Sequence, residues 1–297
     1  MSQFLQATVN GLSLAAVYAL IAVGFVVIYK STQVLSFAQP ALVVTGAYFV
    51  AYFGFTLGWN FWLALVLAVL IAIGLGLFVE RTALRPMIGK PVFSVAILTI
   101  GLDVAIRTVI NDLIGVDFLG VGSPWLGQFD WGGAFIRHAQ IATIVITIVL
   151  VAAVVSFFRY SRLGLAMRAA AFDQEVALAQ GISVAVVFAV AWGMAGGLAA
   201  VAGMLIGTGF AGVSAGTAFV ALKALPAIVV GGIDSLPGAL AGSLIVGLAE
   251  AYAATYQAGN FDFLGANFSQ VVPWLVMFVV LLVRPYGLFG TREVERV

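Results

Sequence analysis

Four ionisable residues stand inside long apolar stretches, where a charge is costly and therefore informative. Asp103 and Arg107 lie four residues apart in one stretch, Lys223 stands in another, and Glu250 stands in the next. A single charge costs about 2.5–3.5 kcal/mol at the centre of a membrane, so such residues pair with one another or face a polar cavity. We expect Asp103 to pair with Arg107 along one helix and Lys223 to pair with Glu250 between two helices. For the second pair, a structural role and a role at a polar cavity both remain open.

The composition explains why these charges stand out. Of the 297 residues, 63% are hydrophobic and only 8% are charged, whereas a soluble domain carries roughly 25% charged residues. Apolar stretches of about 20 residues recur, and each can cross about 30 Å of hydrocarbon as a helix. They are too long for the alternating strands of a membrane β-barrel. The sequence therefore predicts an all-α, polytopic transmembrane bundle that forms one domain over residues 1–297.

The apolar stretches can be drawn as nine segments, and eight full spans plus one broken span fit equally well. Gly and Pro interrupt several of them, so at least one broken helix is expected. The segments are roughly 8–29, 34–53, 61–79, 92–111, 139–158, 184–206, 218–233, 238–256 and 270–283.

The basic residues predict which ends of the segments face the cytoplasm. Short cytoplasmic loops carry an excess of Lys and Arg. If the loop at 159–183 is cytoplasmic, alternation of the spans places ten of the thirteen basic residues on that side and leaves residues 112–138 as a largely irregular outer loop. The ten residues are Lys30, Arg81, Arg85, Lys90, Arg159, Arg162, Arg168, Arg284, Arg292 and Arg296.

The loop at 159–183 is the longest charge-bearing interruption of the apolar chain. It holds three Arg, one Asp and one Glu, is rich in Ala, and lacks Pro. This pattern predicts one short helix outside the lipid, with Gly181 placed to end it. A short amphipathic helix held between two membrane spans is well suited to receive a push from a soluble partner.

Two apolar segments are interrupted by Pro and Gly, and such breaks can expose backbone to a cavity. The first runs over 36–41 and continues to 48; the second runs over 222–238. Tight helix packing and ordinary turns remain the alternative for both. The candidate residues for a translocation path are Ser36, Phe37, Gln39, Thr45, Lys223 and Glu250.

The sequence lacks the residues that several classes of function require. The chain has no Cys and a single histidine, His138, so thiolate and multi-histidine metal sites are excluded. It also lacks the G-x-x-x-x-G-K-[ST] phosphate loop, a nucleophile–base set and a basic nucleic-acid patch. We therefore expect no catalytic residues, metal, cofactor or nucleic-acid partner. Any ATP-driven work must come from another subunit.

Four stretches together resemble one family. They comprise 10–24, then 36–48, then 164–182, and finally 223–250 with 284–290. In their order and spacing they are similar to the permease subunits of bacterial importers of the ATP-binding-cassette (ABC) class that take up branched-chain, hydrophobic amino acids. Pro40 departs from that family's pattern, in which Gly commonly follows the preceding residue.

The resemblance implies a multi-pass protein of the bacterial inner membrane and a larger assembly. The partners would be a second homologous permease or a second copy of this chain, two ATPase subunits, and a periplasmic or extracellular binding protein. The cytoplasmic loop would dock into an ATPase subunit, and its matching residues are Gly164, Arg168, Ala169, Asp173, Ala177 and Gly181.

Other functions remain open at this point. Urea and short-amide importers share much of the same pattern, so the solute is not fixed by it. A transporter or channel that works alone would need intramembrane acids facing a cavity, and Asp103 and Glu250 each have a plausible basic partner. A scaffold without transport activity is disfavoured by the polar breaks near residues 36 and 223.

Overall fold

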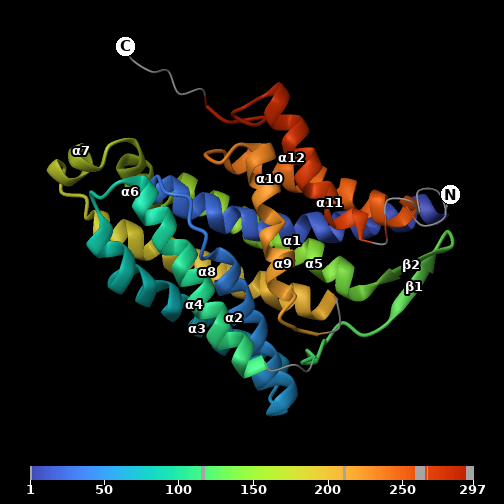
Figure 1. Cartoon of the computed structure of the whole chain (residues 1–297). Coiled ribbons are helices and arrows are strands. Elements are labelled where there is room, and N and C mark those ends of the chain that lie inside the picture. Colours follow the sequence, from blue (N-terminus) through green and yellow to red (C-terminus); the bar gives the residue numbers. More distant parts are fainter. Residues whose placement is uncertain (1, 115–117, 210–211, 258–264, 266, 292–297) are drawn as a thin grey trace. The chain divides into compact units, whose positions relative to one another are not determined.

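The computed structural model describes residues 2–114, 118–209, 212–257, 265 and 267–291 (Figure 1). The regular secondary structure of these residues is almost entirely helical, as predicted. The helices are α1 (Ser2–Thr32), α2 (Gln39–Ala51), α3 (Phe61–Val79), α4 (Val92–Ile114), α5 (His138–Tyr160), α6 (Arg162–Phe172), α7 (Gln174–Ala179), α8 (Val184–Gly209), α9 (Thr217–Leu222), α10 (Ala224–Gly231), α11 (Leu236–Gln257) and α12 (Val272–Val283).

Six of the described helices are long and apolar enough to cross a membrane: α1, α3 with its extension to Met87, α4, α5, α8 and α11. Two shorter apolar stretches, Thr217–Gly231 and Val272–Val283, add to these, and α2 is a further apolar helix of 13 residues. These elements coincide with the nine predicted segments. The all-α membrane bundle is therefore confirmed. The seventh segment is a broken helix, divided into α9 and α10, whereas the second begins with a non-helical stretch at 33–38 and continues as α2.

The chain divides into two compact units. Unit 1 comprises Met1–Ala22, Trp125–Thr147 and Lys223–Val297, and unit 2 comprises Val23–Pro124 and Ile148–Leu222. The boundaries fall inside α1 and α5, so single helices contribute to both units. That the chain forms one domain stays a prediction.

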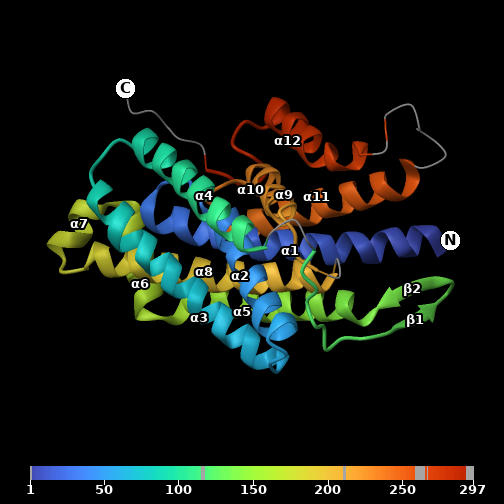
Figure 2. The same cartoon turned by 60° about the horizontal axis from the view of Figure 1, so that its bottom comes forward.

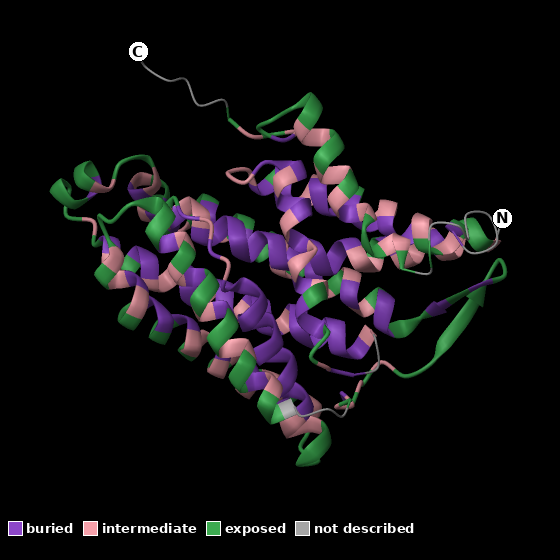
Figure 3. Ribbon diagram, viewed as in Figure 1, coloured by how far each residue is buried: buried purple, intermediate pink, exposed green. Residues whose placement is uncertain are grey.

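Unit 2 is built around α2. Twelve of its 13 residues are buried, and the helix packs against α3, α4 and α8; Figure 3 shows α2 almost entirely in the buried colour. Small residues allow the closest approach. A Cβ atom on Gly46 would lie 2.2 Å from the Ala200 Cα atom, and one on Gly203 would lie 2.3 Å from the Val43 carbonyl oxygen.

Replacing Gly46 by Ala is expected to destabilise unit 2 by about 1–3 kcal/mol, because overpacking forces backbone shifts. Thermal unfolding of the detergent-solubilised protein measures the effect. Gly101→Ala is the matched control, since a Cβ atom on Gly101 of α4 meets nothing within 4 Å. Equal stability of the two variants would contradict close packing of α2 on α8.

The helix ends that carry most of the predicted cytoplasmic charges meet within unit 2. One cavity is lined by residues from the end of α1, from the α3–α4 connection, from α7 and from the start of α8, and these ends lie together at the left of Figures 1 and 2. This arrangement is what an alternating topology with a basic cytoplasmic side requires. Arg292 and Arg296, also predicted on that side, lie outside the described residues.

Unit 1 joins the first part of α1 to α10, α11 and α12. Gly247 of α11 sits so close to α1 that a Cβ atom on it would lie 2.5 Å from the Ala15 nitrogen. A similar approach of α11 to α10 leaves 2.0 Å between a Cβ atom on Gly242 and the Ala227 carbonyl oxygen. These close approaches determine which faces of α11 pack against α1 and α10.

The outer loop differs from its prediction. Strands β1 (Gln128–Trp131) and β2 (Ala134–Arg137) form an antiparallel hairpin (Figure 2), where little regular structure was expected. The prediction was wrong because Gly132 and Gly133 do not merely interrupt the loop: both adopt positive φ, 61° and 80°, which a two-residue hairpin turn requires. The Phe135 amide also donates to the Gln6 Oε1 atom at 2.8 Å.

Candidate coupling segment and polar sites

The charged loop at 159–183 forms two helices, α6 and α7, rather than the single helix predicted from its composition. Asp173 has an extended backbone, with φ −157° and ψ 112°, and it separates them. Its carboxylate accepts hydrogen bonds from the Glu175 and Val176 amides at 2.9 and 3.0 Å, which caps α7. Composition alone does not predict such a cap, because Asp at this position is compatible both with one continuous helix and with two helices.

The ends of this segment are fixed by local chemistry. The Ser161 hydroxyl accepts a hydrogen bond from the Gly164 amide at 2.8 Å and begins α6. Gly164 also lets α6 fold back on α5, because a Cβ atom there would lie 2.5 Å from the Phe157 carbonyl oxygen. Gly181 adopts φ 80° and ends the turn after α7, as predicted.

The outer surface of α6 and α7 mixes charge with large apolar side chains. Arg168, Asp173 and Glu175 are exposed, while Phe172 is 94% exposed and Val176 is 57% exposed. Among the predicted coupling residues, Gly164 and Ala177 are buried, Ala169 is half-buried, and Gly181 is exposed. Arg168 and Asp173 can therefore meet a partner directly, whereas Gly164 and Ala177 position the helices.

The broken start of α2 is stabilised by α4. Pro40 lies in the first turn of α2, where helix amides lack partners within the helix. The Asp103 carboxylate accepts from the Ala41 amide at 3.0 Å, and the Thr99 hydroxyl accepts from the Phe37 amide at 3.0 Å. The sequence had suggested only a pair between Asp103 and its neighbour on α4.

That pair is also present. The Asp103 Oδ2 atom accepts from the Arg107 Nε atom at 2.7 Å and lies 2.5 Å from the Nη2 atom. Asp103 thus joins a cation on its own helix to the start of α2. An acid inside an apolar segment indicates that Asp103 needs polar partners. The sequence does not identify the Ala41 amide, on another helix, as one of them.

Asp103→Asn is expected to lower the stability by about 1–2 kcal/mol, because an amide oxygen can still accept from Ala41 but the ion pair is lost. Asp103→Leu removes both interactions and should cost more. Denaturation in detergent compares the two variants, and Asp112→Asn on the same helix is the control. If the Asp103→Leu variant were as stable as the Asp103→Asn variant, the contact with α2 would contribute nothing to stability.

Gln39 is the most deeply placed polar residue of the first break. It is fully buried, and its amide nitrogen donates to the Ala195 carbonyl oxygen at 3.4 Å. Space for it comes from Gly24, where a Cβ atom would lie 2.2 Å from the Gln39 Nε2 atom. The Oε1 atom of Gln39 has no partner in the described part of the chain. Gln39 therefore carries one buried acceptor that the described side chains and backbone leave unsatisfied.

The other predicted path residues of this break are less available. The Thr45 hydroxyl donates to the Ala41 carbonyl oxygen of its own helix at 2.7 Å. The Ser36 hydroxyl accepts from the Ala38 amide at 3.3 Å, and Phe37 is half-buried. Both hydroxyls thus satisfy local backbone groups.

The predicted pair between Lys223 and Glu250 is present in unit 1. The Lys223 Nζ atom lies 2.5 Å from the Glu250 Oε1 atom, and Glu250 is 7% exposed. The Tyr18 hydroxyl of α1 donates to Oε2 at 2.6 Å, a partner that the sequence did not indicate because Tyr18 lies in an unbroken apolar helix. Lys223 itself occupies the break between α9 and α10.

The second Gly- and Pro-rich stretch packs against the C-terminal segment. The Leu288 and Phe289 amides donate to the Val230 and Gly231 carbonyl oxygens, each at 2.9 Å. The Thr291 hydroxyl donates to the Asp234 Oδ2 atom at 2.5 Å. The turn at 231–238 is thereby held by backbone pairing with 288–291, which favours a structural role for it.

The predicted path residues fall into two groups. Ser36, Phe37, Gln39 and Thr45 belong to unit 2, whereas Lys223 and Glu250 belong to unit 1. Within the described residues, no group of three or more His, Asp or Glu side chains could hold a metal ion.

A bundle of long apolar helices with buried ion pairs and an exposed, charged helix pair is the architecture of a polytopic membrane protein. Residues 7–281 match the family described as the branched-chain amino acid transport system permease component, and the chain belongs to this family. It is a multi-pass protein of the inner membrane and works with other components of an ABC importer.

Individual relatives match over almost their whole length. The chain is 33% identical to the high-affinity branched-chain amino acid transport system permease protein LivH of Escherichia coli (strain K12), over 99% of this chain and 98% of that one. It is 32% identical to the corresponding permease protein BraD of Pseudomonas aeruginosa, with the same coverage. A probable LivH of Methanocaldococcus jannaschii is 28% identical over 91% of this chain and 88% of its own.

A solved structure shares the fold. The structure titled PsaBC from Streptococcus pneumoniae in complex with Fab superposes with a TM-score of 0.51 and 16% identity, covering 95% of this chain and 92% of that chain. At this level of identity the likeness concerns the arrangement of helices alone.

Proposed function

We propose that this permease moves branched-chain or other hydrophobic amino acids inward across the membrane, driven by ATP hydrolysis on separate subunits. The relatives named for branched-chain amino acid transport, 32–33% identical over nearly the whole chain, support the solute class. The absence of a phosphate-binding loop from the sequence supports the division of labour.

The observation that carries the coupling is the exposed surface of α6 and α7. A side chain as large as Phe172 that is 94% exposed, four residues after the exposed Arg168, is costly in water and is suited to an aromatic anchor in a partner's pocket. We place this surface against an ATPase subunit. Motion of that subunit then reaches α5 through the contact at Gly164 and reaches α8 through the short link after α7.

The proposed assembly contains a second permease, either a homologue or another copy of this chain, two ATPase subunits, and an external solute-binding protein. The binding protein would supply most of the selectivity. In the permease, Gln39 offers an unpaired buried acceptor, and we assign it to the path for the solute. Lys223 and Glu250 neutralise each other, and we assign this pair to holding their helices together.

Reconstitution in vesicles tests the proposed function. Labelled leucine, isoleucine and valine should accumulate only when the ATPase subunits, ATP and the binding protein are all present. Urea and acetamide serve as competing solutes. ATP-dependent uptake of urea but not of leucine would replace the proposed solute, and uptake by the isolated chain without ATP would instead identify a transporter that works alone.

A further inference from the structure

Four polar residues of α4 follow one another at a constant spacing. Thr99, Asp103, Arg107 and Asn111 stand at intervals of four residues along this membrane-spanning helix. Residues four apart are neighbours on one side of a helix, so these side chains form a polar row. The row covers about 18 Å of helix at a rise of 1.5 Å per residue. It therefore extends over more than half of the hydrocarbon thickness of about 30 Å.

The cytoplasmic half of this row packs against α2 and the residues before it. The Thr99 hydroxyl accepts from the Phe37 amide and the Asp103 carboxylate accepts from the Ala41 amide, each at 3.0 Å. Both contacts join residues that are 62 positions apart in the sequence. The two helices consequently run parallel at one register, and the row follows α2 towards the outer side.

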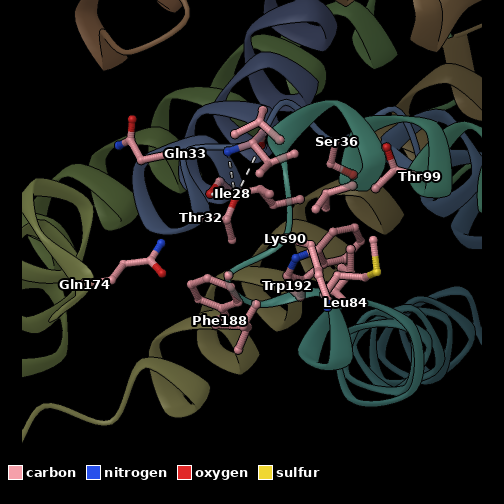
Figure 4. A pocket seen from close by; sticks show the side chains of 16 residues that line it. Ile28, Thr32, Gln33, Ser36, Leu84, Lys90, Thr99, Gln174, Phe188 and Trp192 are labelled. Atoms are coloured by element: carbon pink, nitrogen blue, oxygen red, sulfur yellow. Dashed lines mark hydrogen bonds between the residues drawn. The ribbon is translucent and has the colours of Figure 1, made fainter. Parts of the chain in front are cut away.

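The row begins at a cavity among the helix ends that are predicted to be cytoplasmic. The cavity has a volume of about 270 Å³, and Thr99, Ser36 and Gln174 are among the residues that line it (Figure 4). Thr99 thus contributes both to this cavity and to the polar row. The row leads from the cavity along the start of α2, where the predicted path residues of the first break stand.

Arg107 is the member of the row with hydrogen-bond donors to spare. A guanidinium carries five N–H donors. The Nε and Nη2 atoms bind Asp103, and the Nη1 atom has no partner within the described residues. The side chain is 25% exposed although it stands inside a span, level with Thr45 of α2. Charged groups inside spans face the bundle interior or a water-filled cavity, so the free edge of this guanidinium requires polar surroundings.

The direction of the Arg107 side chain argues against contact with lipid headgroups. Arg107 stands seven residues before Ile114, the last residue of α4, and this end of the helix is predicted to face the outside. The ion pair turns the guanidinium back to Asp103, one turn closer to the cytoplasm, whereas an arginine that snorkels extends its charge towards the nearer membrane surface. Partial exposure is instead expected for a residue on a path that two permease halves share.

We propose that the polar row of α4 lines the solute path and that Arg107 binds the α-carboxylate of the passing amino acid. The edge formed by the Nη1 and Nη2 atoms is available for the two parallel hydrogen bonds that a guanidinium makes to a carboxylate. Asp103 neutralises the guanidinium, so the site carries no net charge and suits a zwitterion. The inference rests on the proposed function, and it adds a group that recognises a carboxylate, which urea and short amides lack.

A double variant separates this role from a structural one. Asp103→Asn with Arg107→Gln removes both charges together and keeps an acceptor for the Ala41 amide, so no buried charge is left alone. The reconstituted importer should still assemble and hydrolyse ATP, but leucine uptake should fall at least about tenfold, the effect of one lost hydrogen bond to a charged group. Glu80→Gln with Arg85→Gln removes another ion pair of unit 2 and should leave uptake unchanged.

A single thiol tests the surroundings of residue 107 directly. The sequence contains no Cys, so Arg107→Cys combined with Asp103→Asn carries the only thiol of the chain. In the assembled importer it should react with water-soluble 2-aminoethyl methanethiosulfonate, and the ammonium group that this adds should restore part of the uptake. The 2-sulfonatoethyl reagent adds a negative charge and should restore none. Thr108→Cys, at the exposed neighbouring position, is the lipid-facing control and should not react.

The outcomes that would overturn the proposal are distinct. Parental leucine uptake by the double variant would refute the role of Arg107 but leave the proposed function intact. A thiol at residue 107 that reacts no faster than one at residue 108 would place Arg107 against lipid. Reactivity in the isolated chain that disappears on assembly would place it against the second permease. Equal restoration of uptake by both reagents would exclude a role for the positive charge.

Discussion

Replacing Arg168 by Glu is expected to lower ATP-driven uptake at least about thirtyfold while leaving insertion into the membrane intact. Arg168 is exposed on α6, and its side chain forms no ion pair among the residues that the structure describes, so we expect its substitution to act on the partner. Reversing a charge that is desolvated at an interface costs about 2–5 kcal/mol, which corresponds to this loss of productive complex. Uptake and co-purification of the ATPase subunits measure it.

Arg81→Glu is the control for this experiment. Arg81 is exposed at the end of α3, on the same predicted side of the membrane, and the substitution makes the same change of charge. It should leave uptake within about twofold of the parent. Normal uptake by Arg168→Glu, or an equal loss in both variants, would contradict a specific role of α6 in coupling.

Replacing Glu250 by Gln is expected to destabilise the protein by about 3–5 kcal/mol, because the Lys223 ammonium, whose side chain is only 12% exposed, is left without its counter-charge. The Tyr18 hydroxyl can still donate to the Gln side chain, so the loss is that of the charge. Thermal unfolding in detergent measures it. The double variant with Lys223→Met should recover most of the stability, since neither charge is then buried.

The double variant also separates the two roles that the sequence left open. If the pair only holds helices together, the double variant is stable and transports leucine. If either residue meets the solute, the double variant is stable but inactive. Single variants as stable as the parent would contradict the contact between the two side chains.

The spans were predictable because each depends on a local property. An apolar stretch of about 20 residues specifies a membrane helix whatever lies beside it, and the predicted 61–79, 92–111 and 139–158 correspond to α3, α4 and α5. The breaks at Pro40 and Lys223 were also local signals, since Pro removes a helix donor and a charge interrupts an apolar run.

The contacts between helices were not predictable in the same way. Asp103 meets Ala41 across 62 residues and Tyr18 meets Glu250 across 232 residues, and hydrophobicity does not encode which faces meet in lipid. The contact between Lys223 and Glu250 was predictable, because each is a charge without a partner on its own segment and the two segments are neighbours in the sequence.

Two errors in the predicted local structure have physical causes. Asp173 acts as a cap through its side chain, and composition alone cannot distinguish a helix that continues from one that restarts. Gly132 and Gly133 were counted as interruptions, although successive glycines also permit the positive φ angles of a tight hairpin. The roles of Arg168, Asp173 and Gln39 in transport stay predictions.

The most direct measurement is thiol labelling. Because the sequence contains no Cys, a single introduced Cys is the only thiol in the chain. Phe172→Cys places it at a side chain of α6 that is 94% exposed, and Phe135→Cys places a matched thiol on β2, at a side chain that is 56% exposed. An impermeant maleimide should label residue 172 only from the cytoplasmic side and residue 135 only from outside, and the ATPase subunits should protect residue 172 alone. Labelling of residue 172 from outside the cell, or its full reactivity in the assembled importer, would contradict the coupling role of α6 and α7.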